Sequence, residues 1–195
     1  MFTPTRRALR ALALLGFALA LVTSAAAQTV NDAYSVGYFE RFRGVFFVNT
    51  GQIGSPIDTA SNLGNVCADI YVFDANQEML ACCSCPLTAN ELSFLTEVDI
   101  LTSVSVPRGV IKVVADAGCD ETSIPRPVPG GLRVWGKNLQ AGGRVTEFVY
   151  PTVPLTATES QFLGQACSFV HYLGSGKGTC ACKQQAQDAR LISGE

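Results

Sequence analysis

The chain has 195 residues, with 16 acidic against 14 basic residues and a formal net charge of −2 at pH 7. This acidic balance would repel phosphate backbones, so we expect no nucleic-acid partner. The length is enough for one domain with its own hydrophobic core, and the low charged fraction of 15% with 18 glycines suits an extracellular β-rich protein.

The first 27 residues have the three parts of a secretory signal peptide. Adjacent arginines precede an apolar run over residues 11–22, and cleavage is expected after Ala27. Residues 28–195 would then form a single secreted β-rich domain, extracellular or periplasmic; loss of 3 of the 14 basic residues leaves 11 against 16 acidic ones, a net charge of −5. The run is shorter than the roughly 20 residues of a membrane span, so we expect no span in the mature form. The export route, general or twin-arginine, stays open.

Aromatic and β-branched residues dominate residues 34–48, which predicts the first strands of the fold. An apolar segment so close to the cleavage site could instead pair with the sheet of a neighbouring copy. The residues of this possible assembly strand are Tyr34, Val36, Tyr38, Phe39 and Phe42. Its competing role, as part of the chain's own core, stays open.

Alternating apolar residues over 66–73, turn residues over 74–77 and a returning segment over 79–83 predict a β-hairpin. Further strands are predicted at residues 97–106, 110–115, 132–135 and 144–149. The proline-rich residues 124–131 cannot donate ladder hydrogen bonds at their prolines, so they are predicted to form an extended connector.

Two capping boxes, Thr88-x-x-Glu91 and Thr156-x-x-Glu159, predict two helix starts. The second helix is predicted to run to Leu173 and to pack one apolar stripe on a sheet. That stripe comprises Phe162, Leu163, Ala166, Phe169, Val170 and Leu173. The predicted fold is mainly β: a disulfide-stapled β-sandwich or barrel-like domain with one C-terminal amphipathic helix and possibly a second short helix.

Eight cysteines behind a signal peptide predict a disulfide framework made in an oxidising compartment. They are Cys67, Cys82, Cys83, Cys85, Cys119, Cys167, Cys180 and Cys182. We expect the cluster at 82–85 to be linked to the cluster at 180–182. Four thiolates around zinc are the alternative. Cys82 and Cys85 have the Cys-x-x-Cys spacing typical of zinc sites, but the cluster at 180–182 does not, and an oxidising compartment favours disulfides. We therefore expect no metal and no cofactor.

Individual residues give few indications of chemistry. His171 is the only histidine, and no Ser-His or Cys-His set or nucleophile-elbow motif accompanies it, so we expect no enzyme. Trp135 and Tyr150 are of the kind that lines pockets for sugars or small apolar ligands, although such side chains also serve cores.

The runs Cys67-Ala68-Asp69-Ile70-Tyr71-Val72-Phe73-Asp74 and Cys82-Cys83-Ser84-Cys85-Pro86-Leu87-Thr88 carry a resemblance. With Val134-Trp135-Gly136 and the cysteine-rich tail, the chain resembles a group of uncharacterised secreted proteins from environmental bacteria. The resemblance implies an exported, disulfide-bonded domain and brings no known activity.

Three hypotheses of function follow from these patterns. The leading one is a non-catalytic extracellular structural or adhesion-type protein, which assembles with itself or with another extracellular component through its apolar N-terminal segment. The second is a secreted module that binds a carbohydrate or another small molecule through Trp135 and Tyr150. The third is a metal or redox protein that uses the cysteine clusters.

Overall fold

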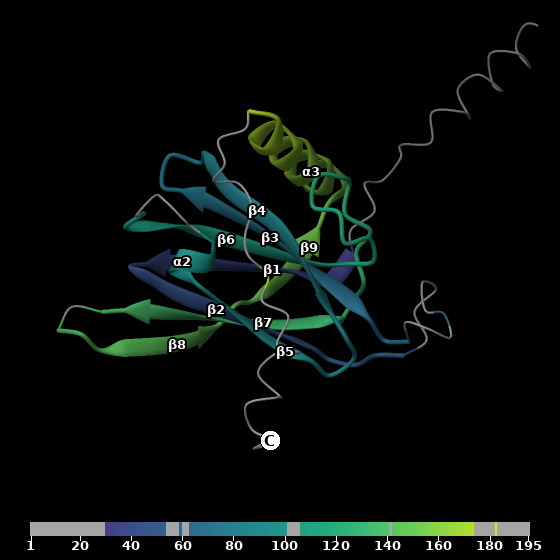
Figure 1. Cartoon of the computed structure of the whole chain (residues 1–195), viewed down its shortest axis with the longest axis horizontal. Coiled ribbons are helices and arrows are strands. Elements are labelled where there is room, and N and C mark those ends of the chain that lie inside the picture. Colours follow the sequence, from purple (N-terminus) through teal and green to yellow (C-terminus); the bar gives the residue numbers. More distant parts are fainter. Residues whose placement is uncertain are drawn as a thin grey trace, which may run out of the picture.

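The computed structural model of the protein describes residues 30–53, 59, 63–100, 106–140, 142–173 and 182. The predicted signal peptide and Cys180 lie outside the described residues. The described part consists of two antiparallel sheets packed face to face, with a long helix lying across the outer side of one sheet (Figure 1).

The larger sheet has the strand order β4-β3-β6-β1-β9 and the smaller sheet the order β5-β2-β7-β8. The strands of the larger sheet are β1 (Val30–Glu40), β3 (Val66–Asp74), β4 (Met79–Leu87), β6 (Arg108–Asp116) and β9 (Thr152–Leu155). Those of the smaller sheet are β2 (Phe42–Asn49), β5 (Leu92–Thr96), β7 (Leu132–Leu139) and β8 (Val145–Val149). The helices are α2 (Glu97–Ile100) and α3 (Ala157–Tyr172). The predicted mainly β fold with a C-terminal helix is confirmed, and its form is a two-sheet sandwich. A second short helix is also present, although not at the place that the sequence predicts.

The larger sheet is covered on both faces, which explains why β3 is buried along almost its whole length. Successive strand residues point to opposite faces. Ile70 therefore lies in the core between the two sheets, and Tyr71 lies in a second cluster with Leu163 and Cys167 of α3. Strands covered in this way consist of nearly continuous apolar residues, as the sequence of β3 does.

The first capping box does not start a helix, so that prediction is wrong. Glu91 Oε2 accepts hydrogen bonds from the Thr88 N–H and hydroxyl, as in a capping box. However, Asn90 has a φ of 65°, and this left-handed conformation cannot continue a right-handed helix. The box closes a turn that leads into β5, and the short helix α2 follows β5 where the sequence predicts a strand over 97–106.

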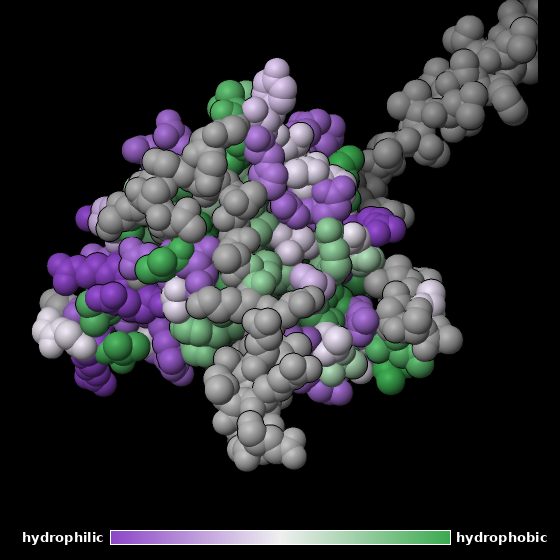
Figure 2. Space-filling view, viewed as in Figure 1, coloured by the Kyte–Doolittle hydropathy of each residue, from purple (hydrophilic) through white to green (hydrophobic). Residues whose placement is uncertain are grey.

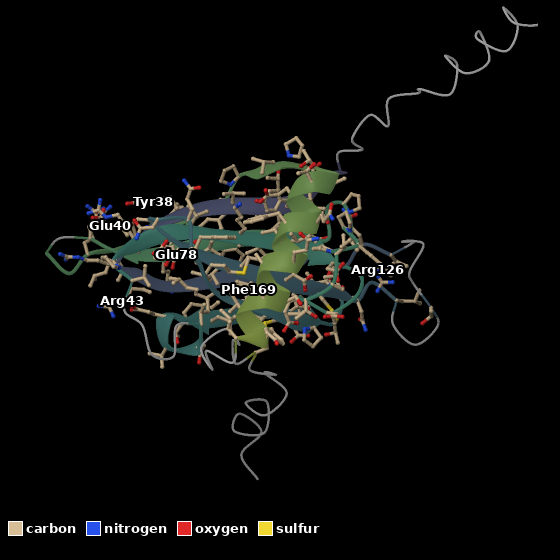
Figure 3. The ribbon with its side chains drawn as sticks, turned by 90° about the horizontal axis from the view of Figure 1, so that it is seen from above. Tyr38, Glu40, Arg43, Glu78, Arg126 and Phe169 are labelled. Atoms are coloured by element: carbon tan, nitrogen blue, oxygen red, sulfur yellow. A yellow bond between two sulfur atoms is a disulfide. The ribbon has the colours of Figure 1, made fainter. Side chains whose placement is uncertain are left out.

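The second capping box begins α3 as predicted: the Thr156 hydroxyl accepts a hydrogen bond from the Glu159 N–H at 3.1 Å. The predicted buried stripe is wrong at several positions. Phe162 is 46% exposed and Phe169 62% exposed, and Figure 3 shows Phe169 on α3. The helix instead buries Ser160, Leu163, Gly164 and Cys167. Small residues face inward because α3 packs tightly against the loop over residues 117–126: a Cβ at Gly164 would lie 2.3 Å from the Ser123 carbonyl oxygen.

Candidate functional site

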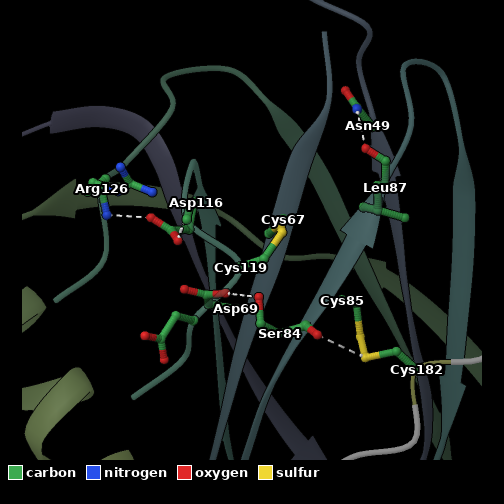
Figure 4. The surroundings of a disulfide bond; sticks show 12 residues. Asn49, Cys67, Asp69, Ser84, Cys85, Leu87, Asp116, Cys119, Arg126 and Cys182 are labelled. Carbon is green, nitrogen blue, oxygen red and sulfur yellow. Dashed lines mark hydrogen bonds between the residues drawn. A yellow bond between two sulfur atoms is a disulfide. The ribbon is translucent and has the colours of Figure 1, made fainter. Parts of the chain in front are cut away.

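The cysteines form a framework that fastens three outlying segments to the larger sheet. The pairs in the described residues are Cys67–Cys119, Cys82–Cys167 and Cys85–Cys182, with Cα–Cα distances of 5.2, 5.8 and 5.4 Å. They hold the loop after β6, the helix α3 and a segment beyond that helix, respectively; Figure 4 shows two of the three. The Cys85–Cys182 bond joins the two clusters that the sequence predicts to be linked. Cys83 is disulfide-bonded as well, and its partner lies outside the described residues.

The same cysteines are the residues that a metal ion would need. Two groups have ligand atoms within 4.8 Å of one another: Cys82, Cys167 and His171, and Cys83, Cys85 and Cys182. Every sulfur in these two groups belongs to a disulfide, so a metal would need the bonds to be reduced first. His171 Nε2 lies 3.6 Å from Glu121 Oε1 and makes no hydrogen bond within the described residues.

The outer face of the smaller sheet carries a row of apolar side chains across all four of its strands. Phe94, Phe46, Trp135 and Val149 are successive partners in the registers of β5, β2, β7 and β8; we call these four residues the aromatic row. The Phe46 ring stacks on Phe94 at 4.1 Å and on Trp135 at 5.3 Å between centroids. Val149 ends the row and is 72% exposed.

Charged side chains of opposite sign flank the aromatic row. Lys137 Nζ lies 4.4 Å from the centroid of Phe46 and 3.1 Å from Glu147 Oε1. A cation over an aromatic face is attracted by the ring quadrupole, and the carboxylate neutralises its charge. The Lys137 ammonium also lies over the Phe94 ring, 5.7 Å from its centroid, so the row is apolar and partly covered by a pair of balanced charge.

Trp135 and Tyr150 do not share a pocket. Trp135 belongs to the aromatic row on the outer face, whereas Tyr150 is 2% exposed and lies in the core between the sheets. The Tyr150 ring fills the space above two glycines, because a Cβ at Gly37 or Gly136 would come within 2.2 or 2.5 Å of it. A hydroxyl in this apolar site stays protonated, since burial raises the pKa of Tyr150.

The residues of the predicted assembly strand are distributed over β1 and the start of β2. β1 pairs with β6 on one side and with β9 on the other, so releasing it to another copy would break hydrogen bonds on both sides. Phe39 is fully buried, and the Tyr34 hydroxyl donates to Glu159 Oε1 at 2.9 Å. Tyr38 is 54% exposed. Phe42 begins β2, and its side chain lies outside the description.

A buried carboxylate beneath α3 and the 117–126 loop was not identified from the sequence. Asp69 on β3 accepts a hydrogen bond from the Ser84 hydroxyl through Oδ1, while Oδ2 is buried without a hydrogen-bond partner in the described residues (Figure 4). Burial raises the pKa of Asp69 to about 8, and the nearby Asp116, Glu121 and Asp120 also raise it, against the opposing effect of the Ser84 hydrogen bond. The carboxyl group is therefore largely protonated at neutral pH.

The sequence also missed Phe46 and Phe94 as candidate site residues. Their positions depend on which strands are neighbours, and strand order is not encoded in any local pattern. Within the described residues, none of the helices is long and apolar enough to cross a membrane. Comparison with models of protein families, with curated proteins and with solved structures finds no match.

Proposed function

We propose that the protein is a non-catalytic extracellular structural or adhesion-type subunit that associates with further copies of itself through the aromatic row. The observation that carries the proposal is the row itself: four apolar side chains in register across the outer face of one sheet. Contiguous apolar surface of this kind is characteristic of interaction sites.

The chemistry of the face favours a second copy as the partner. Sheets in sandwiches pack face to face about 10 Å apart through interdigitating side chains. An identical face would place apolar residues against apolar residues, and the Lys137–Glu147 pair offers both signs of charge for a self-complementary contact. Burying a valine that is now exposed contributes about 1.5–3 kcal/mol, so Val149 is the residue at which association is most easily tested.

The disulfides agree with an oxidising environment outside the cytosol. Export by the predicted signal peptide completes this part of the proposal. The non-catalytic part of the proposal rests on the sequence, in which no Ser-His or Cys-His set or nucleophile-elbow motif accompanies the chain's single histidine.

A carbohydrate site built on Trp135 has less support. Sugars stack on open aromatic faces, but the Trp135 ring is stacked on Phe46 with an interplanar angle of 11°. Its predicted companion Tyr150 is buried in the core. A metal or redox function would require the buried disulfides to open.

The test is the effect of charge at Val149 on self-association. We expect the weight-average sedimentation coefficient of the mature protein to rise with concentration, and the emission of its only tryptophan, Trp135, to shift to shorter wavelength. Val149→Lys should abolish both changes, because the lysine ammonium would have to be desolvated within an apolar contact.

Val98→Lys is the matched control, because Val98 on α2 is 73% exposed and Val149 is 72% exposed. The control should associate like the wild type. A wild-type protein that stays monomeric up to millimolar concentration, or equal effects of the two lysines, would refute assembly through the aromatic row.

A further inference from the structure

We propose that the hollow between the ends of β1 and β7 binds a neutral saccharide. This site is separate from the aromatic row, so the inference goes beyond the proposed function and stands without it. Two adjoining hollows of about 520 and 410 Å³ meet there and share Tyr38 and Asn138 in their walls. Small-molecule sites typically enclose roughly 300–1,000 Å³.

The hollow is open because two strands change sheets beside it. The chain passes from β8 to β9 through Tyr150 and Pro151, and from β1 to β2 through Arg41, which has a φ of 50°. The Arg41 carbonyl accepts a hydrogen bond from the Leu139 N–H at 3.1 Å, which holds the end of β1 against β7. The walls are therefore strand ends held by main-chain bonds, which is the support that a pre-organised site needs.

The polar lining is made of planar and hydroxyl-bearing groups. Beside Tyr38 and Asn138, the first hollow is lined by Glu40, Arg41 and Gln140. Amide, carboxylate and guanidinium groups present donors and acceptors in pairs, which matches the neighbouring hydroxyls of a sugar ring. Figure 2 shows hydrophilic residues gathered at the end of the sandwich where β1 ends, and Figure 3 places Tyr38 and Glu40 at that end, opposite Arg126.

An exposed aromatic ring supplies the apolar half of the recognition. The Tyr38 side chain is 54% exposed, and no ring contact to Tyr38 is found within the described residues. The second hollow adds Val36, Phe148 and Pro151. A saccharide has the same two kinds of surface, because its C–H faces are apolar and its rim carries hydroxyls.

Asn138 provides an acceptor that lacks a donor. Its Oδ1 is buried and has no hydrogen-bond partner among the described residues, although buried polar atoms are paired in the great majority of cases. The residue lines both hollows, and its amide would have to turn toward them before a sugar hydroxyl could donate to Oδ1.

Main-chain groups add to the polar wall. Val36 donates its N–H to the Pro151 carbonyl on the side of β9, and alternate residues of an antiparallel strand direct these groups to the same side. The N–H and C=O groups of Tyr38 and Glu40 therefore also point to the side of β9. The register between β1 and β9 ends at Ser35, before these two residues. Two residues are a short edge for adding a peptide strand, since strands usually run roughly 3–10 residues, so the lining favours a saccharide over a peptide.

The charges favour a neutral ligand and binding without hydrolysis. Glu40 and Arg41 are the charged residues of the described lining, and they have opposite signs. Glycoside hydrolysis commonly needs two carboxyl groups across the scissile bond, and Glu40 supplies one.

The experiment is isothermal titration calorimetry of the mature, oxidised protein with cellohexaose, xylohexaose, chitohexaose and maltohexaose. We expect saturable binding of at least one of them in the micromolar to millimolar range. Tyr38→Ala and Gln140→Ala should each weaken it about tenfold or more, whereas Tyr38→Phe should retain the stacking and bind within a few-fold of wild type.

Tyr172→Ala is the matched control, because Tyr172 is an 87% exposed tyrosine on α3, and it should leave binding unchanged. The substituted side chains at 38 and 140 are exposed, so folding should be preserved and is checked by circular dichroism. Three outcomes would overturn the proposal. None of the four sugars binds, Tyr38→Ala and Gln140→Ala do not weaken the binding, or the hollow binds an extended peptide and no sugar. None of these outcomes bears on association through Val149.

Discussion

Asp69 shows how burial controls the charge state of a single residue. The carboxyl group is fully buried between the larger sheet and its covering elements, where the charged form is disfavoured. Its folded-state pKa of about 8 lies above the ordinary value of 3.8. The contribution of such a group to the free energy of unfolding is fully present below pH 3.8. It is lost as the pH rises toward 8.

Asp69→Asn should therefore raise the free energy of unfolding at pH 8 by about 1–3 kcal/mol, because it removes the cost of burying a charge. The gain should shrink as the pH falls toward 4. Urea unfolding without a reducing agent, at pH 4, 6 and 8, measures the difference. Glu78→Gln on the exposed hairpin turn serves as the control and should show no such trend. A difference between wild type and Asp69→Asn that stays constant across these pH values would contradict the assignment.

At the scale of elements, α3 is positioned by fit against a loop more than by its apolar stripe. Ser160 Oγ lies 3.3 Å from the Pro125 carbonyl oxygen, to which it donates, and Cys167 is bonded to Cys82. Between them Gly164 lies against the Ser123 carbonyl. These three small residues let the helix approach closely, and the larger Phe162 and Phe169 remain at its flank.

Gly164→Ala tests this fit through the sign of its effect. In an unconstrained helix, replacing glycine with alanine stabilises by about 1 kcal/mol. Here the added methyl would meet backbone at 2.3 Å, so we expect a loss of about 1–3 kcal/mol from overpacking. Thermal unfolding measures it, with the exposed neighbour substitution Gln165→Ala as the control. A stabilised Gly164→Ala variant would mean that α3 does not pack against Ser123.

Local sequence signals predicted the positions of helices and strands better than which of their faces are buried. The hairpin of β3 and β4 and the start of α3 follow from alternation, turn residues and a capping box, all of which act within a few residues. The failed capping box at Thr88 shows the limit: the bonds form, but Asn90 turns the chain into a strand. Trp135 and Tyr150 lie on opposite faces of the smaller sheet. Their faces depend on how β7 pairs with β8, and contacts between residues far apart in the chain determine that pairing.

For the whole molecule, the disulfides close long loops. Cys85–Cys182 spans 97 residues, and a loop of that length contributes roughly 4–5 kcal/mol in the chain-entropy model. Seven of the eight cysteines are accounted for by the three bonds and by the bonded Cys83.

We therefore expect Cys83 to be bonded to Cys180. Digestion of the unreduced protein, followed by mass spectrometry, should yield a cross-linked species that contains both regions, and alkylation should find no free thiol. Cys83→Ser should expose one alkylatable thiol, at Cys180, while leaving the Cys67–Cys119 cross-link intact. A Cys83→Ser protein without a free thiol at Cys180 would contradict the pairing.

The Cys85–Cys182 bond also has a mechanical consequence. A pull on the chain beyond Cys182 would be transmitted through that bond to β4 and from there to the hydrogen bonds between β4 and β3. The backbone from β5 to α3 lies within the covalent loop, so it cannot be pulled out straight while the bond is intact. Tension on the segment beyond Cys182 would therefore leave the backbone of α3 unextended as long as the bond is intact, a property that suits the structural role proposed above.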